Sequence, residues 1–136
     1  FTLISIVNYL NSANNSIQIR FSSLVAKKEG INEKFSIQEQ EQLIDFHKQL
    51  IKQVKRLNSF FIKFDKAKVE KIISRGQNYK DLEQKYKLDH EIRGATDSNE
   101  GSAEINQLHT QLMDMLKQVN IFIELIASSL VELESE

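Results

Sequence analysis

A regular repeat of apolar residues runs along the last third of the chain. Its positions alternate between steps of three and four, and they are Ile105, Leu108, Leu112, Met115, Val119, Phe122 and Ile126, with Leu133 completing the run. Ser129 takes the one expected position that is not apolar. This spacing is typical of a helix whose apolar seam packs along a partner helix, and it predicts a helix over residues 102–134.

The same segment is also apolar outside this seam. Six further residues lie off it, namely Leu116, Ile121, Ile123, Leu125, Leu130 and Val131. A helix that is apolar around most of its circumference is surrounded by other protein. We expect this helix to form the centre of an intramolecular bundle, although the pattern also fits an interface with another chain. In that second case the candidate interface residues are Leu112, Met115, Val119, Phe122 and Ile126.

Helical periodicity covers most of the preceding chain as well. The pattern predicts helices over residues 2–29, 36–75 and 78–93, followed by a polar loop over 94–101. One face of the first segment carries the apolar residues Leu3, Ile6, Val7, Leu10, Ile17, Phe21, Leu24 and Val25. The stretch 11–16 is rich in Asn and Ser and poor in helix formers, so we expect it to hinge or interrupt that helix.

A few residues mark the ends of these segments. Ser36 followed by Glu39 has the spacing of a capping box, which predicts a helix start there. Gly94 is expected to end the segment before the loop. Gly76 either ends the 36–75 helix or is tolerated inside it, and Asn78 is placed to cap a restart.

The composition supports an all-helical protein. The chain has no proline and four glycines in 136 residues, which fits long helices because proline breaks helix interiors. This length is enough for one domain with a hydrophobic core. We therefore predict a single all-α domain over residues 1–136. It is an elongated antiparallel bundle of three long helices, with room for a fourth, shorter helix at 78–93.

Charge is distributed unevenly, although the net charge is only −1. Residues 47–75 hold nine basic and two acidic side chains, whereas residues 97–136 hold eight acidic side chains against Lys117. The candidate basic band, which lies largely off the apolar stripe of its helix, consists of Lys48, Lys52, Lys55, Arg56, Lys63 and Lys66. This band either faces the acidic final helix or presents itself to an anionic surface such as lipid or nucleic acid.

The chain offers little for catalysis or for metal binding. His47, His90 and His109 each lack the histidine or acidic partner at helical spacing that a metal site on a helix requires. The chain has no cysteine, no Gly-rich phosphate loop and no nucleophile elbow. We therefore predict a non-enzymatic protein with no catalytic residue, metal, cofactor or small-molecule substrate.

Three functions are compatible with these features. The first is an interaction module that assembles with itself or with a protein partner through helix packing. The second is a membrane-surface module whose basic band binds anionic lipid; nucleic acid is the weaker candidate, because the aromatic residues look like core. The third is a helical sensory domain of a larger receptor, for which the sequence shows no convergent polar cluster. We expect a cytoplasmic protein, peripheral to a membrane if the second function applies.

Overall fold

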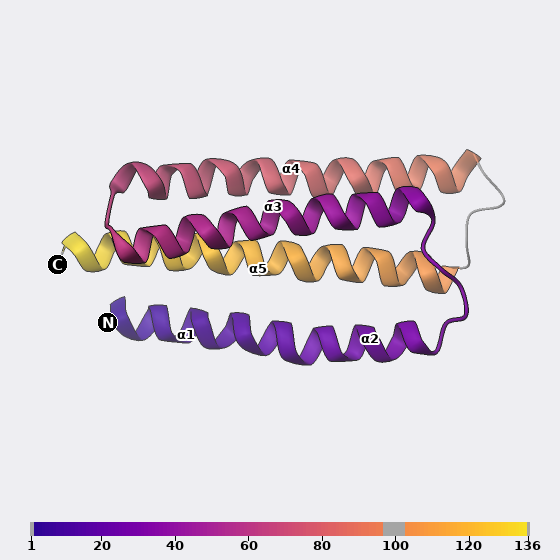
Figure 1. Ribbon diagram of the computed structural model, residues 1–136, viewed down its shortest axis with the longest axis horizontal. Coiled ribbons are helices and arrows are strands. Elements are labelled where there is room, and N and C mark those ends of the chain that lie inside the picture. Colours follow the sequence, from indigo (N-terminus) through magenta and orange to yellow (C-terminus); the bar gives the residue numbers. More distant parts are fainter. Residues whose placement is uncertain (1, 97–102, 136) are drawn as a thin grey trace.

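The protein is a bundle of long helices. The computed structural model describes residues 2–96 and 103–135, and in these ranges the ordered elements are all helical. In chain order they are α1 (Thr2–Asn15), the π-helical turn η1 (Ser16–Arg20), α2 (Phe21–Glu29), α3 (Ile37–Ile62), α4 (Lys66–Thr96) and α5 (Ala103–Ser135). The predicted all-α class and the elongated antiparallel bundle are confirmed (Figure 1).

The first 28 described residues form one nearly straight rod, residues 2–29, made of α1, η1 and α2 (Figure 1). The predicted interruption over 11–16 is wrong in its place: residues 11–15 belong to α1, and the departure from α-helix is the π-helical turn Ser16–Arg20, through which the rod continues. The rod, α3, α4 and α5 alternate in direction along the bundle. The capping box at the start of α3 is also confirmed, because Ser36 and Glu39 exchange both of its hydrogen bonds.

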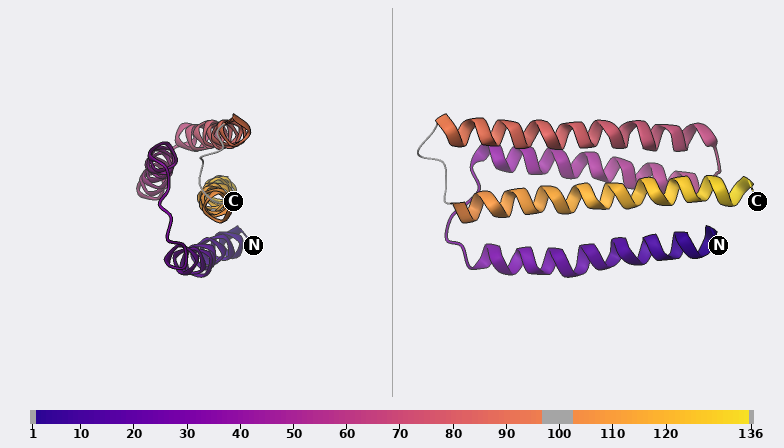
Figure 2. Two further views of the ribbon diagram at one scale, coloured as in Figure 1. Left: turned by 90° about the vertical axis from the view of Figure 1, so that its right-hand side faces the viewer. Right: turned by 180° about the vertical axis from the view of Figure 1, so that it is seen from behind.

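Helix α5 is the central element, as the apolar pattern of its sequence predicted. It approaches the rod, α3 and α4, whereas within the described residues the rod approaches neither α3 nor α4. Figure 2 shows this along the bundle axis, with α5 between α4 and the rod and with α3 to one side. The chain therefore consists of a closed set of three helices, α3, α4 and α5, with the rod laid along α5.

The predicted division between the second and third segments is wrong. The sequence pattern favoured a helix over 36–75 and a shorter one over 78–93, but α3 ends at Ile62 and α4 runs from Lys66 through Gly76 to Thr96. Gly94, the expected end of that segment, lies inside α4, which ends two residues later at Thr96. The remainder of the predicted loop, from residue 97, lies outside the described residues. The segment predicted as a short helix at 78–93 is therefore part of a long helix, α4.

Backbone geometry explains the turn that the sequence pattern concealed. Lys63 leaves the helical region at φ −140° and ψ 111°. The Asp65 carboxylate then accepts a hydrogen bond of 3.0 Å from the Ala67 N–H, and the Asp65 carbonyl accepts one of 2.9 Å from the Lys68 N–H. Asp65 thus acts as the N-cap of α4. Apolar periodicity continues across the turn, and no glycine or proline marks the break in the sequence.

Gly76 is not a helix stop but a point of close approach between α4 and α5. A Cβ atom at this position would overlap the Glu124 carboxylate of α5. That carboxylate forms an ion pair of 2.9 Å with Lys80, one turn further along α4. Because Gly76 has no side chain, the Glu124 carboxylate fits against α4 and pairs there with Lys80.

We expect Gly76→Ala to lower the free energy of unfolding by about 1 kcal/mol, because the new methyl group displaces Glu124 and overpacks the contact. In a Glu124→Ala background the same substitution should instead raise it by about 1 kcal/mol, the usual helix-propensity gain of alanine over glycine. Urea denaturation of the four proteins measures both differences. The same sign in both backgrounds would show that Glu124 does not determine the preference for glycine.

A buried polar network joins α3, α4 and α5. The Gln53 amide of α3 donates hydrogen bonds of 2.9 Å to the Ile72 carbonyl of α4 and 3.0 Å to Asn120 Oδ1 of α5. Asn120 Nδ2 in turn donates to the Gly76 carbonyl at 3.4 Å. Gln53 and Asn120 are only 1% and 0% exposed. Because buried polar groups are costly when unpaired, this network favours one axial register of the three helices.

Candidate functional site

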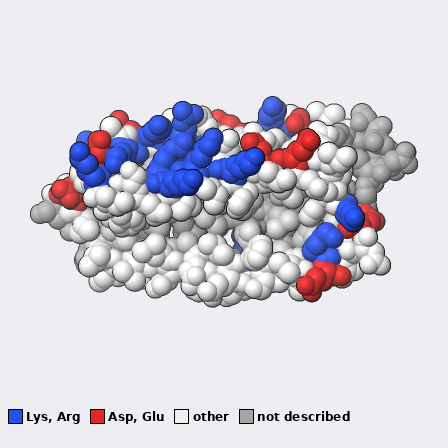
Figure 3. Space-filling view, viewed as in Figure 1, with Lys and Arg blue, Asp and Glu red and all other residues white. Residues whose placement is uncertain are grey.

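The turn at 63–65 folds the predicted basic band back on itself. Four of its residues lie on α3 (Lys48, Lys52, Lys55 and Arg56), Lys63 lies in the turn, and Lys66 begins α4, which adds Lys68, Lys71 and Arg75. All are exposed except Arg56 and Lys68, which are half-buried. Figure 3 shows Lys and Arg side chains gathered over the end of the bundle where α3 and α4 meet at this turn. A band that a single helix would spread out is therefore concentrated into one patch.

The structure does not pair this patch with the acidic final helix. Within the described part of the chain, none of these nine cations forms a salt bridge. The acids of α5 have other partners, because Glu124 pairs with Lys80 at 2.9 Å and Asp114 pairs with Lys87 at 3.2 Å. Both of these lysines lie beyond the patch, further along α4. The positive charge of the patch is thus not neutralised by ion pairs.

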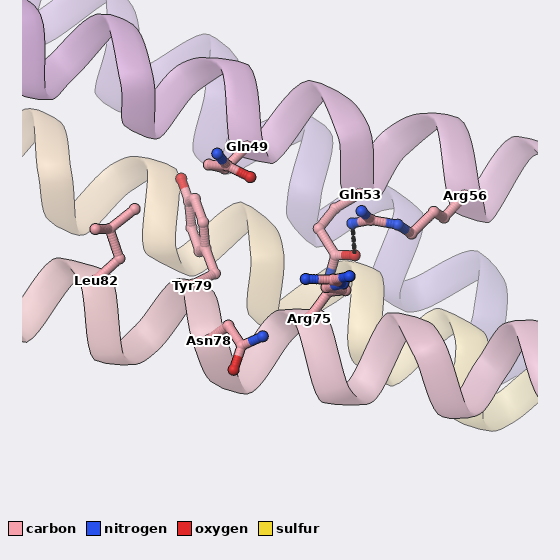
Figure 4. Close-up of a pocket in the computed structure, with 7 residues that line it drawn as sticks. All are labelled: Gln49, Gln53, Arg56, Arg75, Asn78, Tyr79 and Leu82. Atoms are coloured by element: carbon pink, nitrogen blue, oxygen red, sulfur yellow. Dashed lines mark hydrogen bonds between the residues drawn. The ribbon is translucent and has the colours of Figure 1, made fainter.

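Two adjoining pockets lie in the groove between α3 and α4, within this patch. The first, of about 230 Å³, is lined by Gln49, Gln53, Arg56, Arg75, Asn78, Tyr79 and Leu82 (Figure 4). The second, of about 320 Å³, is lined by Lys55, Arg56, Ser59, Lys68 and Lys71. Arg56 belongs to both, so the pockets are neighbours. The sequence showed no convergent polar cluster because these residues meet only once the unpredicted turn brings α4 beside α3.

Arg56 is held in place by a hydrogen bond to Gln53. Its Nη1 donates a hydrogen bond of 2.9 Å to Gln53 Oε1, and Gln53 belongs to the buried network described above. Figure 4 shows the Arg75 guanidinium of α4 beside the same glutamine. Burial and then the nearby positive charge of Arg75 lower the pKa of Arg56 from its ordinary value. Since an arginine stays charged in proteins, two like charges face one groove at an electrostatic cost.

Tyr79 forms a buried wall of the first pocket. Its ring stacks on Phe46 with centroids 3.9 Å apart and planes 5° from parallel. Its hydroxyl is buried and has no hydrogen-bond partner. Burial, with a smaller effect of the Glu83 carboxylate, raises the pKa of this phenol, so that it remains a neutral donor at ordinary pH.

The second exposed feature is the apolar surface of the rod. Only Ile6 and Leu24 among its large aliphatic residues are buried, whereas eight large apolar side chains are exposed. These eight exposed rod residues are Leu3, Ile4, Val7, Leu10, Ile17, Ile19, Phe21 and Val25. The rod lies along the lower side of Figure 3, which is nearly free of charged side chains except at one end. Between residues 2 and 26 the sequence contains one charge, on Arg20.

The candidate interface on the final helix lies largely inside the chain. Met115, Val119 and Ile126 are buried, and Leu112 and Phe122 are half-buried. These residues take part in packing α5 against its own neighbours. Of the remaining seam residues, Ile105 and Leu108 are buried and Leu133 is exposed.

Two of the three histidines meet in the fold. The rings of His90 and His109 stack with centroids 5.4 Å apart, and His90 Nδ1 lies 3.8 Å from Glu39 Oε1. His47 is exposed on α3. In the ranges that the structure describes, no three His, Cys, Asp or Glu side chains are placed to share a metal ion. The histidine contact was missed by the sequence because it joins α4 to α5.

The comparisons with known proteins place no family on these features. Neither a family model, nor a curated protein, nor a solved structure matches the chain. Among the described helices, none has both the length and the apolar character needed to cross a membrane.

Proposed function

We propose that this chain is a non-enzymatic assembly module that self-associates through the exposed apolar face of its rod. The observation that carries the proposal is the one-sided packing of the rod. Its backbone approaches α5 and no other long helix within the described residues, and eight large apolar side chains stay exposed along it. A contiguous exposed apolar surface on a soluble domain is typical of an interface.

Sequence spacing on this face fits the packing of one helix along another. Leu3, Val7 and Leu10 repeat at steps of four and three, and Asn14 takes the next position of the series. This is the spacing of a coiled-coil seam, and a polar Asn at one seam position sets register and the number of strands.

A second copy of this chain is the partner that the charge distribution favours. A self-complementary interface places the same surface on both sides of a two-fold axis, so a charge close to that axis meets its own copy. The rod carries no charge from residue 2 to residue 19, so two rods can face one another without repulsion. The unneutralised basic patch lies over α3 and α4, away from the rod (Figure 3).

Sedimentation velocity on a charge-inserted variant tests this proposal. In Val7→Lys with Leu10→Lys, two apolar seam residues that are half exposed become cationic, and two-fold symmetry doubles the effect. We expect the dissociation constant for self-association to rise by at least about 100-fold, the effect of losing one or two interface hot spots. Circular dichroism and the melting temperature should stay close to those of the parent, because neither residue is buried.

The matched control places two lysines on the other side of the same helix. Asn8 and Ser12 are exposed polar residues one turn apart, and Asn8→Lys with Ser12→Lys adds the same charge. We expect this control to keep the association of the parent. If both variants weaken association equally, net charge and not the rod face is responsible; if a different protein is the occupant, the parent chain stays monomeric and the proposal of self-association is wrong.

A further inference from the structure

The groove between α3 and α4 has the chemistry of an anion site, and binding there does not require self-association. The nine cations around it form no salt bridge within the described residues. The side chains that line its two pockets include five cations and no carboxylate. An uncompensated cluster of this kind attracts anions and raises their local concentration.

The first pocket is organised for hydrogen bonding as well as for charge. Arg56 is oriented by Gln53, which is itself fixed by two hydrogen bonds to α4 and α5. Arg75 faces the same pocket from the opposite helix (Figure 4). Guanidinium groups offer a planar fork of donors that matches phosphate oxygens, and a fixed fork loses little freedom on binding. An anion between the two arginines would also relieve their mutual repulsion.

Neutral donors complete this pocket. Gln49 and Asn78 line it with side-chain amides, and Tyr79 contributes a buried hydroxyl without a hydrogen-bond partner. A buried hydroxyl without a partner is costly in a folded protein, and an acceptor in this pocket would lower that cost. Each of these groups supplies a hydrogen-bond donor to the lining of the pocket.

The adjoining pocket adds a second set of cations. Lys55 of α3 and Lys71 of α4 line it together with Lys68. The Lys68 ammonium donates to Ser59 Oγ at 3.0 Å and to the Ser59 and Lys63 carbonyls at 3.4 Å, so it contributes positive charge and not a free donor. Because Arg56 belongs to both pockets, a ligand with two anionic groups can occupy them together. A membrane surface or a free ligand can supply such a pair of groups.

We propose that the α3–α4 groove binds a ligand carrying at least two phosphate groups, one held between Arg56 and Arg75 and the other by Lys55 and Lys71, with the charge of Lys68 beside them. The recognised chemistry is that of closely spaced phosphates. It is found in soluble polyphosphates and in the headgroups of phosphorylated inositol lipids. Single-stranded nucleic acid has more widely spaced phosphates and binds through aromatic stacking, for which this groove offers only the buried edge of Tyr79.

Titration calorimetry with inorganic triphosphate at physiological salt tests the site on the whole chain. We expect the parent to bind and Arg75→Gln to bind at least about 10-fold more weakly, because a charge-assisted bidentate contact is lost. Arg75 is exposed, so its substitution leaves the core intact. Arg56→Gln should weaken binding similarly, and Arg75→Lys should restore only part of it, since an ammonium lacks the fork.

The matched control removes the same charge outside the pockets. Lys48→Gln with Lys52→Gln takes two exposed cations from the patch but leaves both pockets unchanged. We expect its affinity to fall less than about threefold, through the weaker overall field alone. If this control weakens binding as much as Arg56→Gln with Arg75→Gln, or if the parent does not bind triphosphate, the proposed site is wrong.

A vesicle experiment separates the sources of the phosphates. Phosphatidylcholine vesicles containing a bisphosphorylated inositol lipid are co-sedimented with the chain, with and without triphosphate. Binding that triphosphate displaces and that Arg75→Gln abolishes supports a headgroup as ligand; triphosphate binding without vesicle binding supports a soluble ligand. If a single-stranded oligonucleotide displaces labelled triphosphate as effectively as unlabelled triphosphate does, the patch binds any polyanion and the proposal is overturned.

Discussion

Replacing Phe46 with alanine is expected to lower the free energy of unfolding by about 3–5 kcal/mol, the usual cost of truncating a buried aromatic residue. Phe46 is 0% exposed and lies where α3 faces α4. Its ring stacks on Tyr79 at 3.9 Å and meets the edge of Tyr86 at 6.4 Å. The substitution thus removes buried area and aromatic contacts together. Urea denaturation measures the loss as a lower midpoint at an unchanged slope.

Phe61 on the same helix is the matched control. Its side chain is 50% exposed, so Phe61→Ala removes the same atoms from a half-solvated site. We expect a cost of about 1 kcal/mol or less, in line with substitutions away from the core. Equal losses for the two variants would contradict the placement of Phe46 at the centre of the α3–α4 contact.

The second large effect is expected in the buried polar network. Gln53→Ala leaves Asn120 Oδ1 and the Arg56 guanidinium without the partner that each has in the structure. We expect the free energy of unfolding to fall by about 2–4 kcal/mol, since buried groups without partners cost about 1–3 kcal/mol each and a cavity adds to this. Thermal or urea denaturation gives the difference directly.

A double-mutant cycle with Asn120→Ala isolates the link between α3 and α5. Once Gln53 is truncated, the loss of Asn120 no longer breaks the hydrogen bond of 3.0 Å between the two side chains. The double variant should therefore lose at least about 1 kcal/mol less than the two single losses added together, as contacting residues do. Strict additivity would show that the two amides do not stabilise the fold through one another.

Much of the fold was accessible from apolar spacing alone. The seam from Ile105 to Ile126 and the apolar residues beside it correctly predicted a central final helix, because a helix that is apolar all round needs neighbours all round. Ser36 and Glu39 likewise form the predicted capping box. These features depend on local sequence, which periodicity and capping rules describe directly.

The turn at residues 63–65 could not be obtained in the same way. Phe60 packs before it and Val69 after it, so the apolar repeat runs through the break, and Asp65 is the one local cap residue that marks it. Because the turn was not predicted, the groove between α3 and α4 was not predicted either. Arg56 and Arg75 are 19 positions apart in sequence, and only the fold-back of α4 makes them neighbours.

The exposure of the rod was also missed, for a tertiary reason. The sequence pattern placed its apolar residues on one face, but only the line that contacts α5 is covered, and Leu3, Val7 and Leu10 stay exposed. Periodicity identifies which residues of a helix are apolar. It does not tell how many neighbouring helices the fold places beside them.

The absolute mass of the unmodified chain in solution tests self-association through the rod most directly. Light scattering on a size-exclusion column, across a wide range of loading concentrations, distinguishes the single chain of 15.8 kDa from assemblies. We expect a species of twice that mass that dissociates only on strong dilution. A mass of 15.8 kDa at every concentration would contradict the claim and leave the apolar surface of the rod for another protein to cover.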